Sequence, residues 1–471
     1  MTSPSTTKEL SRLREAIVGV DREVPLLDGS KRPYVYLDNA ASTPAFRAVQ
    51  EKVNEFLQWY SSVHRGAGFK SLLATEAYEE AREIVARFVG ADPEAYCVVF
   101  VKNATEALNK LANRLDLRPD DVVLTTLMEH HSNDLPWRAR AQVVYAGLRE
   151  DGSLDLEDLA RKLEHYKGRV RVVTVTGASN VTGFTPPIYD IAEMAHQAGA
   201  YMVADCAQLA PHRAVRMGDP GSPRHLDFIA FSAHKMYAPF GMGVLIGPRD
   251  FFRNGPPDYR GGGTIEIVNL DEVHWAEPPE RDEAGSPNVV GAVALAESIR
   301  VLSQVGMDAL EAHERDLTRY ALQRLRSLPQ VRVYGSTDPE QLEGRLGVIS
   351  FEVNGVPHGK VAAVLAFEGG IGVRNGCFCA HPYVLNLLRI DPREYQMYKE
   401  RALRGDRSAL PGLVRVSFGC YNTLEEVDRL VEMLERIARG NSAGRYEVDR
   451  PSGMYWPHGF DRASLEKYFA L

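Results

Sequence analysis

The segment FSAHKMYAPFGMGVLIG, residues 231–247, contains the residue with the most direct chemical use, Lys235. Lys235 follows an apolar run and precedes a glycine-rich turn, which places it at the carboxyl end of a predicted strand. An amine in that position can form an imine with an aldehyde cofactor, and its neighbours Ser232 and His234 can donate hydrogen bonds to a phosphate. Taken alone, the pattern is more often that of an exposed lysine beside a turn.

A second predicted strand end offers partners for a pyridine ring. The segment YMVADCAQ places Asp205 at the end of an apolar run, with Gln208 one turn further on. A carboxylate there can pair with a pyridinium N–H and keep the ring an electron sink, and Gln208 can hydrogen-bond a phenolic oxygen. Asp205 alone could equally be a helix cap. Together with Lys235, these residues indicate pyridoxal 5'-phosphate (PLP).

Three further segments supply candidate contacts to such a cofactor. Thr105 in VKNATEALN begins a predicted helix, whose free N–H groups and dipole suit a phosphate, although a simple N-cap is the alternative. His130 in MEHHSN could stack on a pyridine face or belong to an ordinary polar loop. Asn180 in GASNVTGF could reach the cofactor ring or a substrate carboxylate.

The elements that position these residues form an alternating pattern between about residues 34 and 250. Short β-branched apolar runs are separated by amphipathic, helix-length stretches; the runs are residues 97–101, 122–127, 142–146, 170–176, 201–205, 228–232 and 243–247. Continuous apolar strands of this kind predict a mostly parallel sheet that is covered on both faces. The fold class is therefore α/β in this part of the chain.

The remainder of the chain predicts a second, smaller domain. A long helical stretch begins near residue 287, and three strands follow at residues 331–335, 345–353 and 413–419, which is an α+β pattern. We expect an N-terminal segment (1–33) with a short amphipathic helix that packs on the body, a large domain (34–295), a small C-terminal domain (296–440) and an aromatic-rich tail (441–471). Whether the tail packs on the body or on a partner subunit is left open.

Composition limits the classes of function. A chain of 471 residues with 44% hydrophobic residues can bury two cores, and its net charge of −8 is spread along the sequence, so neither nucleic acid nor a membrane surface is an expected partner. No apolar run reaches 18 residues, and the N-terminus lacks the features of a signal peptide. Five cysteines are too few for a disulfide framework, which predicts a reducing cytoplasm.

Nine ordered motifs give the sequence its family resemblance; they are YLDNAASTP, SSVHRGAG, NATEALN, EHHSN, SNVTG, DCAQ, FSAHK, EAGSPN and RNGCFCAHP. Over about residues 34–440 the chain resembles class V aminotransferase-fold enzymes, and within them the group II cysteine desulfurases and selenocysteine lyases. The resemblance implies a PLP fold-type I large domain with a mostly parallel seven-stranded sheet and a small α+β C-terminal domain. It also implies a homodimer with its active sites at the interface.

The resemblance also implies a role for each candidate residue. Lys235 matches the Schiff-base lysine, Asp205 the pyridinium partner, Gln208 the phenolate contact and His130 the stacking ring. Thr105, Ser232 and His234 match phosphate ligands, and Ser286 matches a residue that reaches the phosphate across the dimer, with Gly263 or Thr264 nearby. Arg415 matches the substrate-carboxylate arginine and Arg374 the arginine that opens the loop of Cys379, the sulfur-accepting nucleophile.

The implied activity is a PLP-dependent cysteine desulfurase that converts L-cysteine to L-alanine and forms a persulfide on Cys379, with selenocysteine as a second candidate substrate. A persulfide must then pass to a reductant or to a sulfur-acceptor protein. Two other roles for Cys379 are a buried small hydrophobe and a metal ligand paired with Cys377. Because no matching Cys or His pair lies at a usual spacing, we expect no metal site.

Two departures from the family pattern put the substrate in doubt. Cys377 stands where the group II pattern usually has no cysteine, and the segment 383–412 is longer than expected. This insert predicts an amphipathic helix and a charged turn beside the active-site entrance. The alternatives are therefore a C–S lyase, an epimerase or a decarboxylase that acts on a larger amino acid, and a non-catalytic binding module, which the intact Lys235 and Asp205 argue against.

Overall fold

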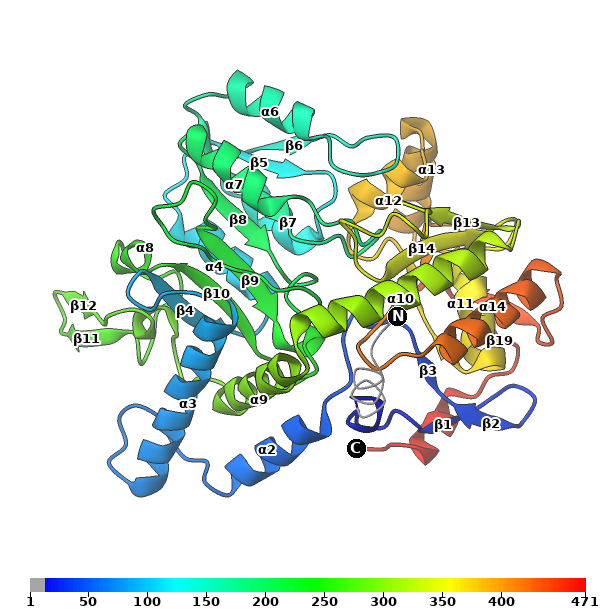
Figure 1. Cartoon of the computed structure of the whole chain (residues 1–471), viewed down its shortest axis with the longest axis horizontal. Helices are drawn as coiled ribbons and strands as arrows, with labels where there is room; N and C mark the ends of the chain where they lie inside the picture. The colour runs from blue at the N-terminus through cyan, green and yellow to red at the C-terminus, as the bar shows by residue number, and fades with distance from the viewer. Residues whose placement is uncertain (1–12) are drawn as a thin grey trace.

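The computed structural model describes residues 13–471, so most of the amphipathic helix expected near the N-terminus lies outside the described residues. A short hairpin of β1 (Glu23–Pro25) and β2 (Lys31–Pro33) comes first, followed by β3 (Val35–Tyr36). Figure 1 shows two sheet-containing bodies joined by the long helix α10 (Met307–Arg326).

The larger body is built on a seven-stranded sheet. Its strand order is β4 (Tyr96–Val101), β10 (Gly243–Pro248), β9 (Phe228–Ser232), β8 (Tyr201–Asp205), β7 (Val170–Thr176), β5 (Val122–Thr126) and β6 (Gln142–Ala146). Strand β10 is antiparallel to both of its neighbours, and the remaining pairs are parallel. This sheet confirms the predicted α/β fold, and each of its strands lies on one of the predicted apolar runs.

Alternate residues of each strand pack into different cores, which is why the strands are apolar throughout. On β9, Ile229 and Phe231 join one core while Phe228 and Ala230 join the other. The first core is covered by α2 (Arg47–Leu57), α3 (Phe69–Phe88), α6 (Leu156–His165), α7 (Ile188–Gln197) and α9 (Val289–Val305). The second is covered by α4 (Ala104–Arg114), α5 (Leu135–Arg138) and α8 (Arg249–Arg253).

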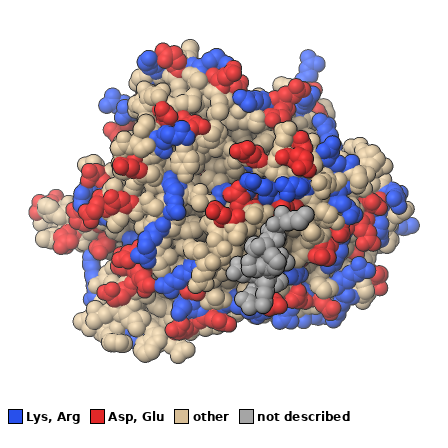
Figure 2. Space-filling model, in the orientation of Figure 1, with Lys and Arg blue, Asp and Glu red and all other residues tan. Residues whose placement is uncertain are grey.

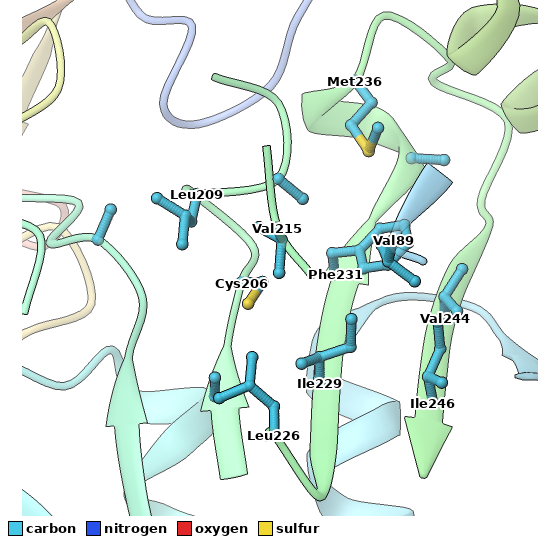
Figure 3. Packing of buried hydrophobic residues seen from close by; sticks show 14 of the residues in the cluster. Val89, Cys206, Leu209, Val215, Leu226, Ile229, Phe231, Met236, Val244 and Ile246 are labelled. Carbon is cyan, nitrogen blue, oxygen red and sulfur yellow. The ribbon is translucent and has the colours of Figure 1, made fainter. Parts of the chain in front are cut away.

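Cys206 belongs to the first core rather than to a reactive site. Figure 3 shows Ile229 and Phe231 of β9 beside Val244 and Ile246 of β10, with Cys206 in the same apolar cluster. Burial raises the pKa of the Cys206 thiol. Two other thiols, those of Cys97 and Cys420, are also buried, so these three cysteines are core residues.

The helical stretch predicted from residue 287 is broken into α9 and α10. Gly306 lies between them with a φ of 88°, a left-handed conformation that glycine adopts without strain, and the two helices are bent by 77°. Within residues 13–471 no single helix is long and apolar enough to cross a membrane. Only when the bent pair α9 and α10 is taken together are the length and composition sufficient. Figure 2 shows acidic and basic side chains interspersed on the visible face.

The smaller body contains an antiparallel four-stranded sheet. Its order is β13 (Val331–Tyr334), β14 (Val348–Val353), β17 (Leu413–Ser417) and β16 (Arg374–Gly376). Helices α10, α11 (His358–Gly369) and α14 (Leu424–Ala438) pack on it, and β15 (Ile371–Gly372) pairs with β3. Strand β16 was not predicted, because its sequence RNG carries no apolar signal.

The insert and the tail are both folded. The insert forms α12 (His381–Leu387) and α13 (Pro392–Leu403), and α13 has no buried residue. The tail forms a hairpin of β18 (Tyr446–Asp449) and β19 (Met454–Pro457), followed by a 3-10 helix, Arg462–Lys467. Strand β19 packs against α11, and Trp456 stacks on Phe460 beside Phe367, so the tail packs on the body of its own chain.

A buried ion pair fastens α3 to the loop that precedes α9. Arg82 donates to Glu283 at 2.8 Å, and the side chains of the two residues are 11% and 6% exposed. The same carboxylate accepts the N–H of Phe100 and the hydroxyl of Tyr78. Removing one partner of such a pair leaves a buried charge without its counter-charge.

The substitution Arg82→Met should therefore lower the free energy of unfolding by about 3–5 kcal/mol, measured by urea denaturation. The control is Arg87→Met, which removes an exposed pair with Glu83 and should change the stability by about 1 kcal/mol or less. Equal losses from the two variants would contradict this account of the pair.

Candidate active site

The carboxyl ends of the parallel strands open into a cavity of about 400 Å³. Its lining includes every predicted site residue except Ser286, namely Thr105, His130, Asn180, Asp205, Gln208, Ser232, His234, Lys235, Arg374, Cys379 and Arg415. These residues come from both bodies of the chain. The cavity therefore lies where the large sheet meets the β16–β17 edge of the small one.

Lys235 and Asp205 are held on neighbouring strand ends. Asp205 is the last residue of β8, and Lys235 lies in a 3-10 helix, Ala233–Lys235, directly after β9. Burial lowers the pKa of Lys235 to about 8, while the negative charge of Asp205 opposes that shift. Burial raises the pKa of Asp205, and the 3.0 Å hydrogen bond from the Ala207 N–H partly offsets that rise. About a tenth of the amine is therefore neutral and nucleophilic at pH 7, far more than for an ordinary lysine.

One end of the cavity is lined by hydrogen-bond donors at the start of α4. Asn103 caps the N–H of Glu106 at 3.0 Å, and Ser232 accepts the N–H of Ala104 at 2.8 Å. The N–H of Thr105, the other amide of this first turn, does not donate to Asn103 or to Ser232. A Cβ at Gly243 would overlap the backbone of Asn103, so only glycine lets β10 approach the helix start this closely. This end fits a phosphate group.

His130 presents a neutral ring to the cavity. Its Nδ1 accepts the N–H of Ser132 at 3.1 Å, which places the ring proton on Nε2. Burial and then the charge of Lys235 lower the pKa of His130 to about 3. The same two causes lower the pKa of His234 to about 4. Both rings are therefore uncharged at neutral pH, which suits His130 to stacking on an aromatic ring.

Gln208 offers an unsatisfied buried oxygen in the cavity. Its Nε2 donates to the carbonyl of Ala40, and its Oε1 has no hydrogen-bond partner among the described residues. An orphaned polar atom of this kind marks a place where a bound group or water completes the network. With the phosphate-binding end, a buried carboxylate and a nucleophilic amine, the residues present fit PLP.

Two arginines that line the cavity meet at Asp38. Arg374 and Arg415 lie directly opposite each other on β16 and β17, and Asp38 lies between them, 2.7 Å from Arg415 and 3.6 Å from Arg374. Arg415 is 2% exposed and also donates to the carbonyl of Asn180 at 2.9 Å. Sequence reasoning gave Asp38 no role, although it lies in the motif YLDNAASTP.

The loop that carries Cys379 is strained and held from outside. Phe378 and Cys379 have φ values of 51° and 55°, a left-handed conformation that costs non-glycine residues about 1–3 kcal/mol each. Asn180 donates to the carbonyl of Phe378 at 2.7 Å, and the N–H of His131 donates to that of Cys379 at 2.7 Å. The Arg415 guanidinium lies over the Phe378 ring at 5.0 Å. These contacts hold the exposed Cys379 at the cavity.

Comparison with known proteins places the chain in a family. Residues 35–430 match the family described as aminotransferase class V. The chain belongs to that family. It is 36% identical to a probable cysteine desulfurase of Halalkalibacterium halodurans over 88% of this chain and 95% of that protein. It is 37% identical to the cysteine desulfurase of Dickeya dadantii over 89% of this chain and 96% of that protein.

Solved structures give the same family. The apo cysteine desulfurase of Thermococcus onnurineus matches with a TM-score of 0.78 and 34% identity, covering 93% of this chain and 99% of that one. The cysteine desulfurase CsdA of Escherichia coli matches with a TM-score of 0.74 and 29% identity, covering 91% and 98%. These likenesses confirm the class V aminotransferase fold that the motifs indicated.

One predicted residue lies outside the cavity, and one buried residue beside the cavity lining was not predicted. Ser286 is exposed and does not line the cavity of its own chain, so its reach across a dimer stays a prediction. Glu129, beside His130, was missed. It is buried and accepts hydrogen bonds from Thr126, Asn133 and the Thr176 N–H, which ties β5 to β7, and burial raises its pKa to about 8. Its place in MEHHSN was the available signal.

PLP uptake by the apo protein should accelerate as the pH rises and level off above about pH 8, because the neutral amine of Lys235 is the form that attacks an aldehyde. The rate is followed by the absorbance of the bound cofactor. Asp205→Asn removes the negative charge that stabilises the protonated amine and so lowers the pKa of Lys235. The midpoint of the rate-against-pH curve therefore moves to lower pH. A rate that rises steadily to about pH 10, as for an ordinary lysine, would contradict the prediction.

Proposed function

We propose that this chain is a PLP-dependent cysteine desulfurase that converts L-cysteine to L-alanine and takes the sulfur as a persulfide on Cys379. The observation that carries the proposal is the position of that thiol. Cys379 is the exposed cysteine of the chain, and it lines the same cavity as Lys235 and Arg415. The names of the relatives support the same activity.

In this proposal each wall of the cavity holds one part of PLP. Asp205 would pair with the ring nitrogen, Gln208 would contact the phenolic oxygen, and His130 would stack on the ring. Thr105, Ser232 and His234 would bind the phosphate, and Lys235 would hold the aldehyde carbon. When bound, PLP supplies an electron sink for the bond-breaking steps at the amino acid's carbon atoms.

The substrate is oriented by the arginine end of the cavity. Arg415 binds the α-carboxylate, for which a planar guanidinium is well suited, while Asp38 and the Asn180 carbonyl fix the guanidinium plane. The Nε of Arg415 is buried and has no hydrogen-bond partner among the described residues. Lys235, whose amine lines the same cavity, would take the α-proton on its Nζ.

Sulfur transfer then needs no external oxidant. The Cys379 thiolate attacks the substrate sulfur, a new S–S bond forms, and the substrate's C–S bond breaks. The electron pair of that bond stays with the substrate's β-carbon, which takes up a proton as alanine is completed. Cys379 is left as a persulfide, which a thiol reductant or a sulfur-acceptor protein discharges in the reducing cytoplasm.

The proposal includes a homodimer. The hairpin of β11 (Ile265–Val268) and β12 (Val273–Trp275) exposes Ile267, Val268 and Leu270, which are 62%, 52% and 104% exposed. Ser286 is exposed as well, and its loop is joined to the base of this hairpin by the hydrogen bond from the Gly285 N–H to the Gly262 carbonyl. An apolar surface beside a serine expected to serve a partner's phosphate supports pairing of two chains.

With L-cysteine, the PLP-loaded protein should form alanine and reductant-released sulfide in equal amounts. Cys379→Ala removes the attacking thiol and should lower the rate of alanine formation about 100-fold or more. Cys377→Ala is the matched control and should stay within about threefold of wild type, since Cys377 donates to the Pro411 carbonyl and burial raises its pKa to about 12.

The desulfurase proposal would be wrong if the wild type formed no alanine, or if Cys379→Ala turned over at the wild-type rate. Either result would favour a lyase or an epimerase that acts on a larger sulfur-containing amino acid, as the insert 383–412 first suggested.

Arg415→Lys should raise the KM for L-cysteine by about 10–100-fold with a smaller change in kcat, because an ammonium cannot keep the bidentate contact to a carboxylate. Steady-state alanine formation measures both constants, and an unchanged absorption spectrum of the bound cofactor confirms that the variant is folded. A fall in kcat at an unchanged KM would show that Arg415 does not bind the substrate carboxylate.

A further inference from the structure

A second cluster of ionisable side chains lies at the opposite edge of the large sheet from the cavity. His196 is on the last turn of α7, and His225 and Asp227 are in the segment that leads into β9. The side chains of His196, His225 and Asp227 are only 18%, 15% and 9% exposed. Lys235 follows the carboxyl end of the same strand, β9, so this cluster is separate from the active site.

The backbone fixes where both imidazole rings carry a proton. The Nδ1 of His196 lies 2.7 Å from the carbonyl oxygen of Pro223, and the Nδ1 of His225 lies 2.6 Å from that of Ser222. A carbonyl oxygen can only accept a hydrogen bond, so each Nδ1 must be the donor. In a neutral ring the other nitrogen, Nε2, then carries a bare lone pair.

Both of these lone pairs face one carboxylate. The Nε2 atoms of His196 and His225 lie 2.8 Å and 3.3 Å from the two oxygens of Asp227. The rings are stacked with centroids 4.3 Å apart and planes 17° apart. Among the described residues, Lys and Arg side chains form no ion pair with Asp227, whose Oδ2 also accepts the N–H of Met202. If no cation is shared between these three side chains, the Nε2 lone pairs of both rings face the negative charge of Asp227.

Two arrangements remove this conflict. Each ring could take a second proton, which would bring two positive rings face to face around a single carboxylate. Alternatively, one metal ion could lie between the two Nε2 atoms and the carboxylate, which is possible because all three ligand atoms lie within 4.8 Å of one another. The second arrangement also explains the Nδ1–carbonyl bonds, since metal-binding histidines typically donate their other ring N–H to a carbonyl or carboxylate.

We propose that His196, His225 and Asp227 bind a divalent transition-metal ion, with zinc as the reference. Two imidazole nitrogens and a carboxylate oxygen are ligands that zinc accepts, and water would complete the coordination. Two metal bonds of about 2.1 Å at a tetrahedral angle separate their ligand atoms by about 3.4 Å. The 2.8 Å and 3.3 Å separations run to different oxygens of Asp227, so the side chains have to shift to bring both nitrogens and one oxygen to this spacing.

The ion would act as a structural clip. It would join the end of α7 to the entry of β9, at the edge of the sheet away from the cysteine-binding cavity. An ion that binds only the folded chain stabilises it by mass action. Zinc should therefore raise the thermal stability of the protein.

The test uses tag-free, PLP-loaded protein carrying Cys379→Ala, so that the exposed thiol does not compete for zinc. After dialysis against a chelator, calorimetric titration with zinc should show about one ion per chain, and excess zinc should raise Tm by about 3 °C or more. His225→Gln and His196→Gln, each in the same background, should lose both effects. His458→Gln is the matched control, because it removes an exposed imidazole that faces a single carboxylate, Glu447.

Cobalt provides a readout that does not depend on stability. Co²⁺ bound by two imidazoles and a carboxylate should give visible bands without a thiolate charge-transfer band, and these bands should be absent from His225→Gln. If the Cys379→Ala protein binds neither zinc nor cobalt, the proposal is overturned. The arrangement in which each ring takes a second proton would then remain. Zinc binding that survives in both His225→Gln and His196→Gln, or that is lost in His381→Gln beside the active site, would also overturn it.

Discussion

The site depends first on two opposite charges placed on adjacent strand ends with little access to water. Strands β8 and β9 are parallel and in register, with Asp205 opposite Ala230, so the residues that follow β9 have to turn over the end of β8. That turn brings Lys235 to the same buried cavity as Asp205. Burial favours the neutral form of each group, and their mutual attraction opposes it. The balance leaves an amine that is reactive near neutral pH.

A second constraint couples the two sheets. Arg374 and Arg415 would repel each other across β16 and β17, and Asp38, which follows β3, lies between them. The Arg415 guanidinium in turn packs on Phe378 and bonds to Asn180, which holds the carbonyl of the strained Phe378. The thiol of Cys379 is thus positioned by contacts that begin at the large sheet. Loss of Asp38 would disturb the Arg415 guanidinium and the position of the thiol together.

The sequence predicted the large sheet because continuous apolar runs of this length have few alternatives to buried strands. It predicted most of the cavity because the polar cavity residues directly follow those strands. It did not predict β16, whose three residues lack an apolar pattern, nor the part played by Asp38, whose partner Arg415 is distant in the chain. It also gave no sign of the His196, His225 and Asp227 cluster. Those residues have no recognised ligand spacing, and they meet only because α7 packs back on the sheet beside the entry of β9.

Burial also explains how one thiol among five can be selected for chemistry. Cys97, Cys206 and Cys420 lie in cores, where burial raises the pKa of each thiol and excludes a substrate. Cys377 is two residues from Cys379, yet burial raises the pKa of the Cys377 thiol to about 12. The Cys377 Sγ donates a hydrogen bond to the Pro411 carbonyl. Because a thiolate is the nucleophile, Cys377 cannot compete at neutral pH. The left-handed turn at Phe378 and Cys379 is what separates the environments of these two neighbouring cysteines.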